Sequence, residues 1–332
     1  MTREQFEEYF VSIGEKKFKA TQVFEWLYEK RVSNIDDFTN LKKEIREKLK
    51  SDFAFTLPVT LKREMDEYTE KFLFELEDHQ RVEAVLMKHN YGNSVCVSSQ
   101  VGCNMGCKFC ESGRLKKVRN LNTHEMVGQI LSIENMTGMK ISSVVIMGIG
   151  EPLDNYDHVL DFIRIINDAK GMAIGARHIT LSTCGLIPKI KELSDFPLQI
   201  NLAISLHAPN DALRSQIMPI NKVYPLHDLI STIKEYIQKT KRRVTMEYVL
   251  LRNVNDSKEH AIQLAKLLKG MNVYVNLIPY NETSHIEFKK SEKEQIDLFY
   301  QTLQKEHIQV TVRREFGGKI SAACGQLRSK EM

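Results

Sequence analysis

The stretch Gly102-Cys-Asn-Met-Gly-Cys-Lys-Phe-Cys110 places three cysteines, at 103, 107 and 110, in one short loop. Their spacing is Cys-x3-Cys-x2-Cys, and cysteine thiolates are the usual ligands of iron–sulfur clusters and structural zinc. A closed zinc or ferredoxin site takes four protein ligands. Three thiolates around a [4Fe–4S] cube leave one iron open, so the loop predicts a cluster that also binds a non-protein ligand.

The composition agrees with an enzyme of the cytoplasm. The chain has 332 residues, of which 42% are apolar, enough for one large domain and a smaller one. It lacks an apolar run of about 18 residues, and Met1 to Glu8 is polar, so we expect neither a membrane span nor a signal peptide. Six cysteines in such a chain favour metal-binding or catalytic thiols over a disulfide scaffold. Lys and Arg exceed Asp and Glu by 47 to 43, which permits a nucleic-acid partner without demanding one.

The periodicity of apolar residues divides the chain into three parts. Residues 1–52 form a predicted helical module, in which Gln22–Tyr28 and Leu41–Phe53 follow a helical period. Residues 53–90 alternate apolar and polar side chains, notably at 71–77 and 81–86, and predict hairpin strands. Residues 91–332 alternate strands with helices and form the predicted core domain.

The core domain has six strand-like runs, which begin near Ser94, Ser143, His178, Gln199, Arg243 and Val273. Amphipathic segments lie between them, including Thr123–Thr137, Val159–Asn167, Leu226–Gln238 and Glu259–Lys269. Six β-α units in one sheet predict a partial (β/α)6 barrel, a TIM-like α/β fold that does not close. Chemistry in such folds gathers at the carboxyl ends of the strands.

Glycines and polar residues follow several of these strands where the apolar run ends. The relevant stretches are Gly148-Ile-Gly-Glu-Pro152, Ile179-Thr-Leu-Ser182, Leu202-Ala-Ile-Ser-Leu-His207 and Val275-Asn-Leu-Ile-Pro-Tyr-Asn281. Gly148 and Gly150 allow close approach of a ligand to the backbone, and Glu151 can accept from an ammonium group. We therefore expect one ligand site at this rim of the barrel.

With these motifs the chain resembles the RlmN family of radical S-adenosylmethionine (SAM) RNA methyltransferases, whose nearest sister is Cfr. The resemblance covers nearly the whole chain. It rests on Val97–Cys103, Gly148–Leu153, Ala203–Asn210, Met218–Asn221 and Ala322–Leu327. The three cysteines alone indicate only the radical SAM superfamily, whereas their combination with Cys324 near the C-terminus indicates this family.

The resemblance implies methylation of carbon 2 of an adenosine in 23S rRNA, and in some members of tRNA. Adenine C2 has no nucleophilic lone pair, so the family uses a 5′-deoxyadenosyl radical made by reductive cleavage of SAM. It also implies a [4Fe–4S] cluster, two SAM molecules per turnover and a flavodoxin- or ferredoxin-like reductant. We further expect a monomer with no membrane partner.

The resemblance assigns roles residue by residue. Cys103, Cys107 and Cys110 would hold the cluster, and Cys324 would carry the methyl group as S-methylcysteine. Cys96 would help remove the C2 proton and close a transient disulfide with Cys324, and Glu83 would accept a proton. The SAM contacts would be Gly150 and Glu151 for the methionine amino group, with Ser182, Ser205, Leu206, His207 and Asn281 for its other polar edges.

Two features qualify the substrate. Basic residues cluster at Arg114, Lys116, Lys117 and Arg119, at Lys239, Lys241, Arg242 and Arg243, and at Arg313 and Arg314. Such clusters are usually solvated surface, but the first directly follows the cysteine loop and could meet an RNA backbone. The family usually has a small residue where this chain has Glu111, and a carboxylate there could repel phosphate unless Arg114 or Lys116 pairs with it.

Three alternatives remain open at the level of sequence. The enzyme could be a Cfr-like adenine C8 methyltransferase of 23S rRNA, although the stretches 150–153 and 180–185 look more like RlmN. It could be a radical SAM enzyme of another reaction, in which Cys324 would have no purpose. It could also be a non-catalytic iron–sulfur or zinc RNA-binding protein, with Cys96 or Cys324 as the fourth ligand.

Overall fold

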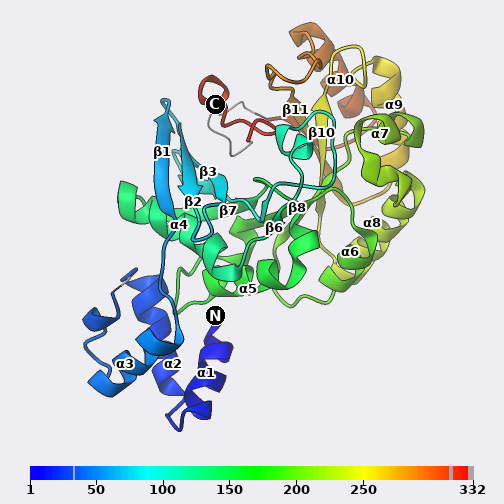
Figure 1. The fold of residues 1–332 in the computed structure, drawn as a ribbon. Coiled ribbons are helices and arrows are strands. Elements are labelled where there is room, and N and C mark those ends of the chain that lie inside the picture. Colours follow the sequence, from blue (N-terminus) through cyan, green and yellow to red (C-terminus); the bar gives the residue numbers. More distant parts are fainter. Residues whose placement is uncertain (33, 314–316, 328–332) are drawn as a thin grey trace.

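The protein is described by a computed structural model over residues 1–32, 34–313 and 317–327. Its centre is a ten-stranded sheet in the order β1-β2-β3-β4-β7-β8-β9-β10-β11-β12 (Figure 1). The strands are β1 (Val59–Met65), β2 (Thr69–Glu75), β3 (Arg81–His89), β4 (Gly92–Cys96), β7 (Ile141–Ile146), β8 (Ile179–Thr183), β9 (Asn201–Ser205), β10 (Val244–Leu250), β11 (Val273–Pro279) and β12 (Val310–Val312). Strands from β4 onward are parallel, and β1 to β4 are antiparallel.

The six predicted core strands are confirmed as β4, β7, β8, β9, β10 and β11. The described strands leave β1 and β12 as the two edges of the sheet, so the barrel is open as predicted. The structure adds β12, a seventh parallel strand that pairs with β11. At three residues, β12 is too short for alternation to reveal it in the sequence.

Helices cover the outer face of the parallel strands (Figure 1). They are α4 (Thr123–Thr137), α5 (Tyr156–Asn167), α6 (Ile187–Leu193), α7 (Asp211–Ile217), α8 (Leu226–Thr240), α9 (Lys258–Leu268) and α10 (Lys293–Lys305). Helix α8 shows why they pack there, because Leu226, Leu229, Ile230 and Ile233 recur at helical spacing and are all buried. The predicted segment at Val159 begins three residues early, at Tyr156, since the turn Pro152–Asn155 leads directly into α5.

The N-terminal residues form α1 (Arg3–Ser12), α2 (Phe18–Phe24) continued by a π-helical turn (Glu25–Glu29), and α3 (Lys43–Asp52). The chain enters the sheet beside α4, where a Cβ on Gly128 would lie 2.7 Å from Pro58 Cδ. Arg31 also pairs with the buried Glu134 of α4 at 2.8 Å. Among the described residues, no helix is both long and apolar enough to span a bilayer.

Candidate active site

The sequence motifs meet at the carboxyl ends of the parallel strands. Cys96 ends β4, and the loop after it forms a small hairpin from β5 (Gln100–Val101) and β6 (Arg119–Asn120) that brackets the three clustered cysteines. Two adjoining cavities lie here. The larger, about 970 Å³ and partly open to solvent, is lined by Cys103, Cys107, Cys110, Gly148, Gly150, Glu151, Ser182, Cys184, Ser205, His207, Glu247, Arg313 and Cys324, among others.

The thiols of the larger cavity suit an iron–sulfur cluster. Burial and the neighbouring thiols Cys110 and Cys103 raise the pKa of Cys107 well above its ordinary value. Burial likewise raises the pKa of Cys103 to about 12. For Cys110, burial also raises the pKa, but backbone N–H groups of Gly113 and Ser112 oppose the shift because they donate toward its sulfur. Three neighbouring thiolates repel one another and are stable in a partly desolvated site only around a strongly positive centre, so the donor set fits a cluster.

Glu151 is fixed at the rim by two backbone donors. Its Oε1 accepts from Leu153 N–H at 3.0 Å and its Oε2 from Cys184 N–H at 2.8 Å. Only 3% of Glu151 is exposed, and burial raises the pKa of its carboxyl. A buried carboxylate in this position favours a cationic ligand in the cavity.

The rim glycines allow close packing of the backbone at this edge of the cavity. A Cβ on Gly150, which has φ +112°, would lie 2.7 Å from Gln100 Cβ, and one on Gly148 would lie 2.7 Å from Val97 O. Both glycines therefore let the rim loop pass close to the chain at 97–100, and both also line the larger cavity. This packing brings Glu151 N–H to Gln100 Oε1 at 2.9 Å.

His207 is a buried neutral base with φ +57°. Its Nδ1 accepts from Val249 N–H at 3.0 Å, and its ring meets Phe109 edge-on with centroids 4.8 Å apart. Burial and the Arg214 cation lower the pKa of His207 to about 3. An imidazole that accepts at Nδ1 carries its proton on Nε2, and His207 lines the larger cavity.

This histidine predicts a pH effect on stability. The folded-state pKa lies below the unfolded value of about 6.5, so its contribution is full above that pH and is lost as the pH falls toward 3. The variant His207→Asn keeps an acceptor for Val249 N–H, tolerates positive φ and does not titrate. Between pH 7 and pH 5, its free energy of unfolding should fall less than the wild type's by roughly 2 kcal/mol. Urea unfolding at several pH values measures this, and parallel pH profiles would contradict it.

Arg214 of α7 ties the ends of two strands, β8 and β9, together from a fully buried position. Its guanidinium donates to the carbonyls of Leu206 at 3.1 Å, Cys184 at 2.7 Å and Ser205 at 3.2 Å, and to Asn221 Oδ1 at 3.0 Å. Nothing in the sequence distinguished it from the exposed arginines of other helices. Its hydrogen bonds fix the backbone under the cavity.

Removal of that guanidinium should destabilise the fold strongly. The variant Arg214→Met would remove the guanidinium donors from the carbonyls of Cys184, Ser205 and Leu206, of which Leu206 O keeps only the hydrogen bond from Ala208 N–H. We expect the free energy of unfolding to fall by about 3–5 kcal/mol. Arg177→Met, at an exposed arginine, serves as the matched control and should change it by about 0.5 kcal/mol or less. Urea unfolding followed by circular dichroism compares the two; equal losses would contradict the role given to Arg214.

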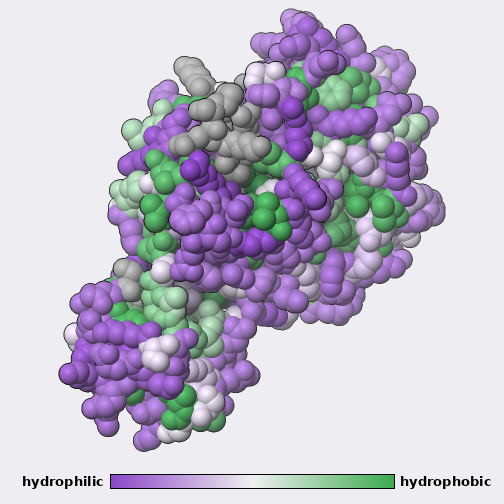
Figure 2. Space-filling model, viewed as in Figure 1, coloured by the Kyte–Doolittle hydropathy of each residue, from purple (hydrophilic) through white to green (hydrophobic). Residues whose placement is uncertain are grey.

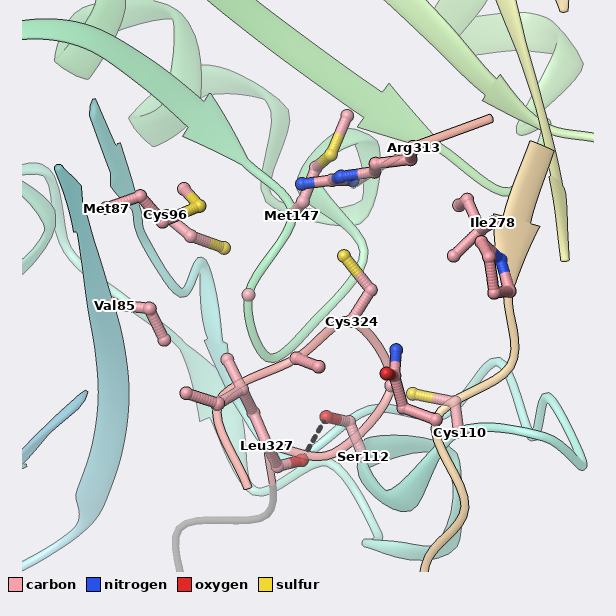
Figure 3. A pocket seen from close by; sticks show the side chains of 16 residues that line it. Val85, Met87, Cys96, Cys110, Ser112, Met147, Ile278, Arg313, Cys324 and Leu327 are labelled. Atoms are coloured by element: carbon pink, nitrogen blue, oxygen red, sulfur yellow. Dashed lines mark hydrogen bonds between the residues drawn. The ribbon is translucent and has the colours of Figure 1, made fainter. Parts of the chain in front are cut away.

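The second cavity, of about 650 Å³, contains the other two thiols of interest. Figure 3 shows Cys96 and Cys324 reaching into it from β4 and from the C-terminal segment, with Met147 and Arg313 beside them. Burial first, and then Cys324, raise the pKa of the Cys96 thiol to about 12, while the Arg313 cation opposes the shift. All six cysteines are free thiols in the structure.

Two charged residues that line the cavities were not predicted to do so from the sequence. Glu247 of β10 is 5% exposed, its Oε2 accepts from Asn276 Nδ2 at 2.9 Å, and burial raises its pKa. A carboxylate inside an apolar strand was the available signal. Arg313 was grouped with Arg314 as a basic surface pair, but it lines both cavities because it directly follows β12. Arg314 lies outside the described residues.

The residues predicted to contact SAM do not all line the same cavity in the structure. Gly150, Glu151, Ser182, Ser205 and His207 line the larger cavity, whereas Asn281 lines the smaller one. Leu206 is fully buried in the apolar core and lines neither.

Glu83 is buried in β3 and lies 3.5 Å from Lys71 Nζ. It shares a strand face with Val85 and Met87, which line the smaller cavity. It is therefore not the surface carboxylate that a charged residue in a hairpin strand would ordinarily be.

The basic cluster after the cysteine loop is mostly engaged within the protein. Arg119 pairs with Asp78 and Glu125, and Lys117 pairs with Asp154 at 2.7 Å. Lys116 is exposed. Glu111 is 4% exposed and lies near Arg114 at 3.8 Å, as the sequence allowed. The side chains of Arg119 and Lys117 are therefore already engaged in ion pairs that stabilise the loop, whether or not RNA is bound.

Figure 2 shows that polar side chains dominate the visible surface, with scattered apolar patches.

Comparison with known proteins agrees with the geometry. Residues 1–54 match the family model of the ribosomal RNA large subunit methyltransferase N-terminal domain, and residues 97–265 match that of the radical SAM superfamily. The chain is 51% identical to a probable dual-specificity RNA methyltransferase RlmN of Spiroplasma citri, over 99% of this chain and 96% of that protein. It is 52% identical to the corresponding protein of Enterococcus faecalis, over 100% and 96%.

A solved structure agrees as well. The crystal structure of a radical SAM methyltransferase from Sphaerobacter thermophilus superposes with a TM-score of 0.94 at 41% identity, over 99% of this chain and 98% of that one. These matches confirm the predicted fold and the predicted cofactors, a [4Fe–4S] cluster and SAM. With relatives about half identical along its whole length, the chain belongs to the RlmN family of radical SAM RNA methyltransferases.

Proposed function

We propose that this enzyme methylates carbon 2 of an adenosine in 23S rRNA, with Cys324 as the residue that carries the methyl group. The observation that supports this most strongly is the placement of Cys324, which lines both cavities. Figure 3 shows it between Cys96 and Cys110, one of the three clustered cysteines. A maturase or a glycyl-radical activase would have no purpose for a thiol there. Cys96 and Cys324, which face one cavity, fit a methyl transfer that passes through S-methylcysteine and is resolved by a disulfide.

The residues of the larger cavity would hold the cofactors. Cys103, Cys107 and Cys110 would ligate the cluster, and Glu151, with Gly150 beside it, would face the methionine amino group. Ser182, Ser205 and His207 would contact the other polar edges, with Asn281 reaching in from the adjoining cavity. When bound, the cluster and SAM supply a methyl group and one-electron hydrogen abstraction. Leu206 would support the SAM site indirectly, from the apolar core. Its backbone N–H donates to the carbonyl of Glu247.

The residues of the smaller cavity would complete the transfer. Cys324 Sγ would take the methyl group of one SAM by displacement, with S-adenosylhomocysteine as the leaving group. A hydrogen atom of this S-methyl group would then pass to the 5′-deoxyadenosyl radical, and the methylene carbon would bond to adenine C2. After the C2 proton has left with the help of Cys96 and one electron has returned to the bound cluster, the Cys96 thiolate would attack Cys324 Sγ. The S–S bond then forms as the Sγ–CH2 bond breaks, and the methylene carbon keeps the electron pair and takes a proton to become the methyl group. Glu83, on the same face of β3 as residues that line the cavity, accepts a proton.

The remaining assignments belong to the same proposal. The relatives are named dual-specificity RNA methyltransferases, which supports tRNA as a second substrate. A flavodoxin- or ferredoxin-like protein supplies electrons to a monomeric enzyme. We divide the chain into a helical module at 1–52, a hairpin extension at 53–90 and a core domain at 91–332.

Anaerobic turnover tests the proposal directly. The cluster-reconstituted protein is incubated with methyl-deuterated SAM, a reductant and unmodified 23S rRNA, and the nucleosides are analysed by mass spectrometry. Labelled 2-methyladenosine is the expected product. Labelled 8-methyladenosine would instead assign the Cfr-like reaction, and cleavage of SAM without any labelled adenosine would mean a different substrate.

A further inference from the structure

The segment that carries Cys324 is attached to the loop that carries the cluster cysteines. Glu111 N–H donates to Gly325 O at 2.8 Å, and Ser112 Oγ donates to Leu327 O at 2.7 Å in a buried hydrogen bond. Gly325 has φ +85°, and a Cβ there would lie 3.4 Å from Phe109 O. The two residues that directly follow Cys110 therefore hold the chain on the C-terminal side of Cys324.

The same segment is held on its other side by the chain after β11. Gln326 Nε2 donates to Glu282 O at 3.1 Å, while Gln326 Oε1 accepts from Ala323 N–H at 3.1 Å. Gln326 thus closes the turn around Cys324 and fastens it to residues 281–290. The Cys324 turn sits between two separate loops of the rim.

The carboxylate of Glu111 joins those two loops. Its Oε1 lies 3.6 Å from His285 Nδ1 and its Oε2 lies 3.8 Å from Arg114 Nη1. Arg114 Nη1 also donates to His285 O at 2.7 Å. Glu111 is 4% exposed and its Oε1 has no hydrogen-bond partner within the described residues, so its carboxylate interacts with Arg114 and His285 by charge and proximity only.

We propose that Glu111 and Ser112 are positioning residues that hold the Cys324 segment between the two cavities. This inference rests on the proposed function of Cys324, which must take a methyl group on one side and meet Cys96 on the other. Ser112 provides the direct hydrogen bond to the segment, and Glu111 fixes the loop that supports it.

Hydrogen exchange of the full-length, cluster-reconstituted protein tests this without any turnover. The variant Ser112→Ala should exchange the amides of residues 322–327 roughly tenfold faster than the wild type. Ser112→Thr, which keeps the hydroxyl, should restore most of the protection. Ser132→Ala is the matched control, since Ser132 also donates to a backbone carbonyl, that of Pro58 at 3.4 Å, but far along the chain from Cys324.

A second variant tests the role of Glu111. Glu111→Gln should speed exchange in residues 281–290, and iron and sulfide analysis verifies that each variant keeps its cluster. In turnover, Ser112→Ala should raise the ratio of 5′-deoxyadenosine to methylated adenosine several-fold, because a loose segment meets the RNA less often. Unchanged exchange at 322–327 in Ser112→Ala, or equal exchange in the Ala and Thr variants, would overturn the inference. Faster exchange in an enzyme whose wild type methylates no adenosine would support the positioning role and refute the proposed function instead.

Discussion

Replacement of Cys324 by alanine is expected to abolish RNA methylation, with a loss of at least about a thousandfold. The methyl group has no other sulfur to receive it on the segment between the two cavities, since Cys184 is buried at the end of β8 with its backbone held by Glu151 and Arg214. SAM cannot transfer its methyl group to adenine C2 by direct displacement, because that carbon offers no lone pair. The loss should therefore be complete rather than partial.

The measurement separates this loss from a loss of folding or of cofactor. Cys324→Ala should retain its cluster, judged by iron and sulfide content, and should bind SAM within about threefold of the wild type. Wild-type protein from cells should carry S-methylation on the Cys324 peptide, and the variant should carry none elsewhere. Labelled methyladenosine from the variant at a tenth of the wild-type rate or more would refute the role of Cys324.

The sequence predicts the barrel well because its signals are local. Buried parallel strands such as β7 and β10 are apolar runs bounded by polar residues, and α8 repeats its apolar residues at helical spacing. In these segments most of the residues that are buried in the fold are the apolar ones. The rim motifs then follow, since the carboxyl ends of parallel strands meet at one edge.

The charged residues of the site were harder to predict because their environment depends on distant parts of the chain. Arg214 lies on a short helix and becomes buried only when β8 and β9 end beside it. Arg313 enters the cavities because β12 adds to the sheet after β11. Glu111 meets His285 only through the folding of residues 280–290 over the cysteine loop. No periodicity within one segment records such contacts.

Replacement of Cys96 by alanine is expected to trap the enzyme on its RNA. Cys96 pairs in register with Val85 of β3 and Val145 of β7, so its thiol is held at a fixed place facing the Cys324 segment. The pKa of the Cys96 thiol is raised to about 12, so the thiol loses its proton only when a nearby positive charge stabilises the thiolate. The Arg313 cation provides that charge. Without the Cys96 sulfur no disulfide forms, and the thioether between Cys324 and adenine persists.

The trapped adduct between Cys324 and RNA distinguishes the role of Cys96 from that of Cys324. After turnover and nuclease digestion, the Cys96→Ala protein should carry a nucleotide on the Cys324 peptide in a large fraction of molecules, while methylated RNA is almost absent. The double variant Cys96→Ala/Cys324→Ala is the control and should carry none, because the attachment atom is missing. Glu83→Gln should slow release and give only a transient, smaller accumulation of nucleotide on Cys324, because Cys96 is still present to break the thioether. A Cys96→Ala enzyme that turns over normally, with no nucleotide on Cys324, would mean that release uses another group and that Cys96 serves only to pack the barrel.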